Sequence, residues 1–314
     1  MPGDLARVFF MRMSREITGL LEVWIILQSR FHDLAACVLP FASRHNPPYS
    51  PPLVPMAAQR IVLKFGSGIL TRQDAPEPDP VQLRKLVEAV ALLKRAGHAV
   101  VVVSSGAVAS GLKPMDFKQR PSDMTTLQAL AAVGQTHLMH AYESLLRDHG
   151  LHVAQLLVTH EDFENADRAP RVKAVLDRLV EFSQVVPVIN ENDSVAVEEL
   201  RYGDNDKLSS RVALFWGADL LVLLTSAPGL LRDMKNPGEE PIPIVERVED
   251  VIHHAEQEKT ALGTGGMISK LRAVQEAVEG GVECIIASGR HAEQIPSLVK
   301  GAGVCTRFPA RGAR

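Results

Sequence analysis

Short runs of β-branched and aliphatic residues alternate with longer amphipathic stretches along the chain from Arg60 onward. Such runs are typical of strands buried on both faces, and their alternation with helical patterns predicts βαβ units and a mainly parallel sheet. Helical periodicity predicts helices at residues 81–95, 127–149 and 171–182, the first of which stops at Gly97. The predicted strands are residues 61–63, 99–103, 153–158, 185–189, 219–224 and 282–287.

The first 55 residues have a different pattern. Charges such as Arg12, Arg15 and Glu22 interrupt their apolar positions, so no run approaches the roughly 20 apolar residues that span a bilayer. No uninterrupted apolar region precedes a small-residue cleavage site, which argues against a signal peptide. A proline-rich run at residues 47–52 is typical of an extended linker. We therefore expect residues 1–55 to be a poorly ordered extension and residues 56–314 to form one domain. Met56 is the expected natural start, and a targeting role for the extension is the alternative.

Composition and charge narrow the class of protein. With 314 residues, of which 46% are apolar and 23% are charged, the chain can bury one large core. The net charge of −3 supplies no positive field that would gather nucleic acid. The three cysteines, Cys37, Cys284 and Cys305, are far apart and lack the spacing of a zinc site, which fits the reducing conditions of the cytoplasm.

Polar residues follow several of the predicted strands, at the edge where sheets of this kind bind ligands. Lys64, Gly66 and Gly68 follow the first strand, where glycine amides can surround a phosphate and a lysine can neutralise its charge. Hydroxyls follow the second strand at residues 104–105, and amides and carboxylates follow a later strand at residues 190–193. A Walker sequence is absent, as is a GxGxxG fingerprint at the first strand. The sequence therefore predicts a phosphate site of another kind.

A second glycine cluster, at residues 263–266, precedes a helical stretch that carries Lys270. Backbone amides and the positive dipole end at a helix N-terminus favour anionic phosphates. Lys64 and Lys270 could then flank one transferring phosphoryl group, whose transfer depends mainly on positioning and charge neutralisation. Each feature also has an ordinary alternative. The glycines can form turns or a flexible loop, Lys270 can be a solvated helix residue, and Asp204 and Asp206 can belong to a surface turn.

Taken together, these residues resemble the glutamate 5-kinases of the amino acid kinase superfamily. The lysine-glycine start is common to the whole superfamily, whereas the Asn-Glu-Asn-Asp, Gly-Asp-Asn-Asp and Gly-Thr-Gly-Gly-Met runs are more specific. The resemblance implies an α/β fold, a three-layer αβα sandwich with a mainly parallel central sheet. It covers about residues 57–309 and rests on residues 62–67, 104–107, 188–193, 203–206 and 263–267.

The resemblance also implies an activity. Enzymes of this family use ATP to phosphorylate the γ-carboxylate of L-glutamate, which yields γ-glutamyl phosphate in the first step of proline biosynthesis. Mg²⁺ would bridge the phosphates of ATP, and no protein ligand to the metal is expected. We expect a cytoplasmic homo-oligomer whose partners are glutamate and ATP, with no nucleic acid and no membrane.

Roles for individual residues follow from the resemblance. Lys64 and Lys270 would stabilise the transferring phosphoryl group, and Asp206 would hold and orient both lysines. The residues implied to bind the amino acid are Ser105, near its carboxylate side, Asp193, at its ammonium group, and Asn205. The residues implied at the nucleotide, besides the two lysines, are Gly66, Thr225, Ser226, Thr264, Gly265, Gly266 and Met267.

The chain departs from the family pattern in three ways. Ser226 stands where the family usually has an aspartate after the threonine of the nucleotide strand. Lys207 stands where a neutral residue is common and adds a charge near the substrate loop. The sequence stops soon after Phe308 and Pro309, before the PUA domain that many members carry, so regulation by proline is not assumed.

Two alternative functions stay open at this point. A related kinase would act on N-acetylglutamate or aspartate, but the carboxylate of Asp193 beside an acetylated nitrogen would be a buried cost. A sensor that binds an amino acid or a nucleotide without catalysis could retain the same fold. The presence of both lysines argues against the sensor.

Overall fold

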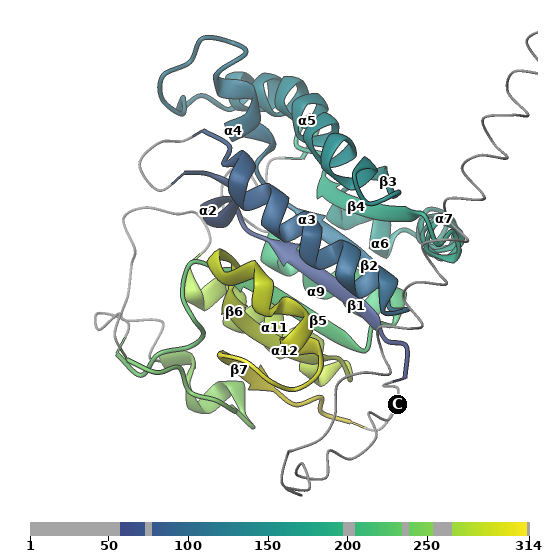
Figure 1. Ribbon diagram of the computed structural model, residues 1–314. Coiled ribbons are helices and arrows are strands. Elements are labelled where there is room, and N and C mark those ends of the chain that lie inside the picture. Colours follow the sequence, from purple (N-terminus) through teal and green to yellow (C-terminus); the bar gives the residue numbers. More distant parts are fainter. Residues whose placement is uncertain (1–56, 73–76, 197–204, 234–238, 254–265, 313–314) are drawn as a thin grey trace, which may run out of the picture. The chain divides into compact units, whose positions relative to one another are not determined.

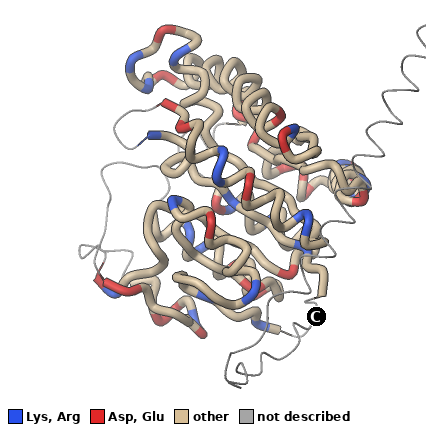
Figure 2. Tube along the Cα trace, in the orientation of Figure 1, with Lys and Arg blue, Asp and Glu red and all other residues tan. Residues whose placement is uncertain are grey.

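The computed structural model describes residues 57–72, 77–196, 205–233, 239–253 and 266–312. The expectations for residues 1–55, Thr264 and Gly265 lie outside these ranges. None of the helices within the described ranges combines the length and the apolar composition that crossing a membrane requires. Lysines and arginines are interspersed with aspartates and glutamates along the described elements (Figure 2).

A seven-stranded sheet with the strand order β3-β4-β2-β1-β5-β6-β7 forms the centre of the described part (Figure 1). Every neighbouring pair is parallel except β6 and β7, which are antiparallel. The six strands predicted from the apolar runs are all present. The strands are β1 Arg60–Phe65, β2 Ala99–Ser104, β3 His152–Val158, β4 Val185–Glu191, β5 Leu220–Thr225, β6 Glu283–Ser288 and β7 Cys305–Phe308.

Helices cover both faces of this sheet (Figure 1). One hydrophobic cluster joins the sheet to α3 (Pro80–Arg95), α5 (Met124–Arg147) and α12 (Ile295–Val299). A second cluster joins the opposite face to α7 (Ala169–Glu181), α9 (Asn205–Trp216) and α11 (Met267–Glu279). The predicted three-layer α/β architecture is therefore confirmed. The shorter elements are α2 Ser67–Leu70, α4 Ala107–Leu112, α6 His160–Glu164, η2 Val248–Asp250 and η3 Gly289–Gln294.

Alternation along β1 decides where its lysine points. Ile61, Leu63 and Phe65 belong to the cluster under α3 and α5, whereas Val62 belongs to the cluster under α9 and α11. Because side chains alternate between the two faces of a strand, Lys64 lies on the same face as Val62. The lysine therefore extends toward the layer that contains α9 and α11.

Two glycines bring α4 and α5 into direct backbone contact. A Cβ atom added at Gly134 would lie 1.8 Å from the carbonyl oxygen of Ala107, and one added at Gly111 would lie 2.1 Å from that of Leu130. Gly106, which links β2 to α4, has a φ of 99°, a left-handed conformation that glycine adopts without strain. These features fix the position of the chain immediately after Ser105.

Candidate active site

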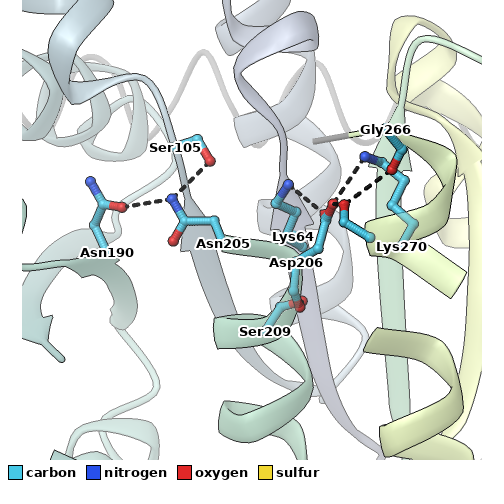
Figure 3. A network of polar contacts seen from close by, with 9 residues as sticks. Lys64, Ser105, Asn190, Asn205, Asp206, Ser209, Gly266 and Lys270 are labelled. Carbon is cyan, nitrogen blue, oxygen red and sulfur yellow. Dashed lines mark hydrogen bonds and ion pairs between the residues drawn. The ribbon is translucent and has the colours of Figure 1, made fainter. Parts of the chain in front are cut away.

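Asp206 forms the centre of a buried charge cluster that joins three distant parts of the chain. Its Oδ1 atom lies 2.6 Å from Nζ of Lys64 at the end of β1. Its Oδ2 atom lies 3.0 Å from Nζ of Lys270 in α11. Figure 3 shows both lysines pointing toward Asp206. The side chains of the two lysines are 5% and 8% exposed, and that of Asp206 is fully buried. The structure thus brings together the two lysines and the aspartate that the sequence singled out.

Asp206 lies in the first turn of α9, a helix that the sequence analysis did not predict. The residues Gly203 to Asp206 are of the types that dominate turns, and this composition concealed the start of the helix. Leu208, Val212 and Trp216 are buried at helical spacing and anchor α9 against the sheet. The interpretation of Asp206 as a surface-turn residue is therefore wrong.

Serine side chains complete the hydrogen bonding around the cluster. The hydroxyl of Ser269 lies 2.8 Å from Oδ2 of Asp206 and 3.0 Å from the carbonyl oxygen of Gly266. Ser209 donates a hydrogen bond of 2.5 Å to the backbone carbonyl of Asp206. Sequence reasoning missed both serines. The partner of Ser209 is a backbone carbonyl, and Ser269 reaches Asp206 in a different helix. Only the position of Ser269 next to Lys270 could have suggested its role.

The electrostatics of the cluster keep Asp206 ionised. Burial by itself raises the pKa of this carboxyl, but the ammonium groups of Lys64 and Lys270 and their hydrogen bonds outweigh burial and lower the pKa to about 2. At neutral pH the cluster therefore holds two positive charges and one negative charge. Such a site has net positive charge in a largely water-excluded setting, which suits a developing anion.

A chain of carboxamides and a hydroxyl adjoins this cluster through Asn205, the residue before Asp206. Nδ2 of Asn205 donates to Oγ of Ser105 at 2.9 Å and to Oδ1 of Asn190 at 3.1 Å (Figure 3). Nδ2 of Asn190 in turn donates to Oε1 of Gln135 at 3.0 Å. Ser105 and Asn205, both predicted to bind the amino acid, are thus in contact at the carboxyl ends of the parallel strands. Asn190 belongs to the polar run predicted at residues 190–193, although it had no role of its own, whereas Gln135 was not predicted because a contact between residues 55 positions apart leaves no local pattern.

Asp193 lies beside this chain in the wall of a cavity of about 240 Å³. Burial and, after it, the carboxylate of Glu191 raise the pKa of Asp193 to about 7, against an opposing effect of Arg120. Oδ1 of Asp193 is buried and has no hydrogen-bond partner in the described part of the chain. A buried carboxylate of this kind is suited to a ligand that brings a positive charge.

Four of the described residues predicted at the nucleotide adjoin the segments that carry the two lysines, namely Gly66, Thr225, Gly266 and Met267. Thr225 ends β5, and Phe65 pairs with Leu224 in the register, so Thr225 and Gly66 leave the sheet side by side. A Cβ atom at Gly66 would lie 3.4 Å from Nζ of Lys64. Ser226 is exposed beyond the end of β5. Gly266 precedes α11 as its N-cap, and Met267 is the first residue of that helix.

The charge cluster does not resemble a site for a directly bound metal ion. Among the described residues, no group of three or more histidine, cysteine, aspartate or glutamate side chains is arranged to hold a metal. Both oxygens of Asp206 are already engaged by ammonium and hydroxyl groups. The arrangement is suited instead to binding a phosphoryl group through two cations and neighbouring backbone amides.

Comparison with known sequences supports this interpretation. The sequence model of the amino acid kinase family matches residues 59–288. The glutamate 5-kinase of Thermus thermophilus is 42% identical over 258 residues, which are 82% of this chain and 69% of that protein. The glutamate 5-kinase of Photobacterium profundum is 40% identical over 84% of this chain and 70% of its own length. That of Aquifex aeolicus is 45% identical over 73% of this chain and 63% of its own length.

Solved structures share the fold. Carbamate kinase from Giardia lamblia bound to AMP-PNP has a TM-score of 0.58 and 17% sequence identity, and the match covers 81% of this chain and 99% of that chain. UMP kinase from Ureaplasma parvum has a TM-score of 0.52 and 14% identity, over 81% of this chain and the whole of that chain. At these identities the likeness concerns the fold alone.

Proposed function

This chain belongs to the amino acid kinase family, and on that premise we propose that it is a glutamate 5-kinase. It transfers the γ-phosphoryl group of ATP to the γ-carboxylate of L-glutamate and forms γ-glutamyl phosphate, the first step of proline biosynthesis. The relatives at 40 to 45% identity carry this name. We also propose that the enzyme is a cytoplasmic homo-oligomer that binds neither nucleic acid nor membranes.

One observation carries the proposal: Lys64 and Lys270 meet at a single buried carboxylate, Asp206. The reaction needs no general base, because the γ-carboxylate has a pKa of about 4.3 and is already ionised at neutral pH. The reaction instead requires that two anions, ATP and the glutamate carboxylate, are brought together. It also requires that the charge of the transferring phosphoryl group is neutralised. Asp206 holds the two ammonium groups next to each other and so prepares them for that charge. Without that carboxylate, the two ammonium groups would repel each other.

ATP and its metal ion bind next to the two lysines, on the side formed by β5 and α11. Gly66, Gly266 and Met267 present backbone amides near the lysines, and Thr225 ends the adjoining strand. The two lysines, Thr264 and Gly265 complete the proposed nucleotide site, together with Ser226 at its edge. Mg²⁺ enters as part of the substrate, held by the phosphates of ATP, and supplies further neutralisation of their charge.

The amino acid lies on the other side of Asp206. Ser105 and Asn205 are hydrogen-bonded to each other there, and Asp193 provides a carboxylate for the free ammonium group of the substrate. An acetylated nitrogen cannot supply that positive charge, so N-acetylglutamate would leave the buried Asp193 without compensation. Aspartate is one methylene shorter and would place its side-chain carboxylate farther from the two lysines. Free glutamate is therefore the preferred acceptor.

The proposal is tested by measuring ADP release with glutamate, aspartate and N-acetylglutamate, each in the presence of hydroxylamine. Hydroxylamine converts an acyl phosphate into a stable hydroxamate, which separates carboxylate phosphorylation from hydrolysis of ATP. We expect equal amounts of ADP and hydroxamate with glutamate and much less with the other two acids. Preference for another acid would show that the proposed substrate is wrong. No turnover with any of the three acids would favour a non-catalytic sensor.

A further inference from the structure

The cavity beside Asp193 contains a second buried polar atom without a partner. Its walls come from α4, α5, β3 and the turn after β4, and they include Gln135, Gln155 and Asp193. Nε2 of Gln135 is buried and has no hydrogen-bond partner within the described ranges, and the same holds for Oδ1 of Asp193. Both residues are 7% exposed. A donor and an acceptor, each without a partner, therefore line one cavity, whereas buried polar atoms are normally paired.

The direction of the Gln135 carboxamide follows from its neighbours. The backbone N–H of Glu191 can only donate, and it lies 2.9 Å from Oδ1 of Asn190. This contact fixes the oxygen of the Asn190 carboxamide, so its Nδ2 must be the atom that faces Gln135. Gln135 must then present Oε1 to Asn190. Its Nε2, with two hydrogens to donate, is left for the cavity.

The position of the cavity shows which end of the substrate it would receive. Gln135 is connected to the charge cluster through Asn190 and Asn205, the residue next to Asp206. The carboxylate that attacks ATP must lie at the lysines, at the far end of this chain of side chains. The cavity is therefore left for the other end of the molecule, which in a free amino acid carries one ammonium group and one carboxylate.

We propose that Gln135 is a specificity-determining residue whose Nε2 donates a hydrogen bond to the α-carboxylate of glutamate, while Asp193 accepts one from the α-ammonium group. This inference rests on the proposed function and extends it to a residue outside the predicted site. The donor and the acceptor match the two charged groups of an amino acid. Asn190 acts on the substrate only indirectly, by orienting Gln135 and Asn205.

The test pairs a variant with a substrate that lacks the group in question. 4-Aminobutyrate is glutamate without its α-carboxylate, and Gln135→Met removes the donor while preserving much of the side-chain volume. We expect the wild-type preference for glutamate over 4-aminobutyrate, measured as the ratio of kcat/KM values for hydroxamate formation, to fall by about 10- to 100-fold in this variant. Where turnover of 4-aminobutyrate is too slow to measure, its inhibition constant against glutamate replaces kcat/KM.

A purely structural role predicts a different result. Activity toward both substrates would then fall by the same factor, and an unchanged ratio would overturn the inference. Glutarate, which lacks the ammonium group, gives a second reading: the Gln135→Met variant should keep its preference for glutamate over glutarate. Equal loss of both preferences would also overturn it.

Two further variants serve as a control and as a substitute for Gln135→Met. Gln128→Met makes the same change at a partly exposed position of α5 outside the cavity wall and should leave the glutamate to 4-aminobutyrate ratio unchanged. Gln135→Glu keeps an oxygen for Asn190, so at pH 8.5 it serves if Gln135→Met does not fold, with the same loss of preference expected. If the wild type forms no γ-glutamyl hydroxamate, the proposed function fails. If the wild type is active and the ratio does not change, only the role of Gln135 fails.

Discussion

At the scale of single residues, Lys270 is the group whose charge the proposed reaction uses most directly. Its ammonium group is held by Asp206 before any substrate arrives, and it lies one turn into α11. Replacing it with alanine should lower kcat by a factor on the order of 10² or more, with only a modest change in the KM for ATP, because the charge acts mainly in the transition state. Steady-state kinetics measure both constants.

Arg272→Ala is the matched control for Lys270→Ala, since it removes an exposed cation from the same helix. This variant should keep its kcat. An unchanged kcat in Lys270→Ala would remove that lysine from the mechanism.

The pKa of Asp193 makes the binding of glutamate depend on pH. Because that pKa is about 7 in the free protein, Asp193 is largely neutral below pH 7 and ionised above it. An ionised carboxylate attracts the substrate ammonium group, so the KM for glutamate should fall as the pH rises from about 6 to 8, by up to about tenfold per unit on the acidic side. In Asp193→Asn the KM should be high and should not vary over this interval.

The KM for glutamate of the wild type and of Asp193→Asn, measured in the same buffers, tests whether Asp193 is the titrating group. Glu191 and Arg120 also act on Asp193 and could contribute their own pH dependence. If Asp193→Asn retained the wild-type slope, the titrating group would be another residue.

The sequence named some residues of the candidate site, both charged and neutral, and gave no role to others. Lys64 and Lys270 were assigned from short motifs after a strand and before a helix, and Asp206 from the family resemblance; the structure brings the three within hydrogen-bonding distance. Gln135 and Ser269 could not be assigned in the same way, because their roles depend on which side chain of a distant element they meet. Their residue types are common on helices and give no local signal.

At the scale of elements, the contact between α4 and α5 controls the turn that carries Ser105. Gly134→Ala would place a methyl group 1.8 Å from the carbonyl oxygen of Ala107, which is backbone and cannot turn away. We expect a loss of about 1 to 3 kcal/mol in the free energy of unfolding, together with a higher KM for glutamate as α4 moves. Urea denaturation and kinetics measure the two effects.

Gly68→Ala provides the control for this substitution, because no heavy atom lies within 4 Å of the added methyl group. It should leave the free energy of unfolding nearly unchanged. A Gly134→Ala protein as stable as the control would show that the two helices can separate freely.

Elements differ in how far the sequence predicts them, for physical reasons. The central parallel strands were predicted because strands buried on both faces must be continuously apolar, and the edge strand β3 was predicted because residues 153–158 are apolar except for the exposed Gln155. α9 was not predicted, because it starts at Asn205 and Asp206, whose residue types favour turns, although Leu208, Val212 and Trp216 follow with helical spacing. β7 was missed as well, because four residues that include an arginine and a threonine carry too little pattern.

At the scale of the whole molecule, Asp206 joins the start of the domain to its C-terminal part. Asp206→Asn would leave two buried ammonium groups without their counter-charge, so it should lower the free energy of unfolding by about 3 to 5 kcal/mol at pH 7. The folded-state pKa of about 2 lies below the ordinary value of 3.8, so this stabilisation is present above about pH 4 and is lost as the pH falls toward 2. The difference between the two proteins should shrink over that interval in urea titrations.

Asp177→Asn is the control for the loss in the free energy of unfolding that is expected in Asp206→Asn. Asp177 forms its ion pairs with Lys173 and Arg60 at the partly exposed surface, where such pairs contribute about 1 kcal/mol or less. If Asp206→Asn were no more destabilising than Asp177→Asn, the buried cluster would not hold the three elements together.

The central claim is that the γ-carboxylate of glutamate attacks the γ-phosphoryl group of ATP directly, between Lys64 and Lys270. Glutamate labelled with ¹⁸O in its γ-carboxylate tests this claim, because hydroxylamine attacks the carbonyl carbon of the acyl phosphate and releases the bridging oxygen with the phosphate. The account predicts one ¹⁸O atom in each phosphate released, in amounts equal to the hydroxamate formed. Phosphate without the label would show that water, and not the carboxylate, receives the phosphoryl group, and would contradict the account.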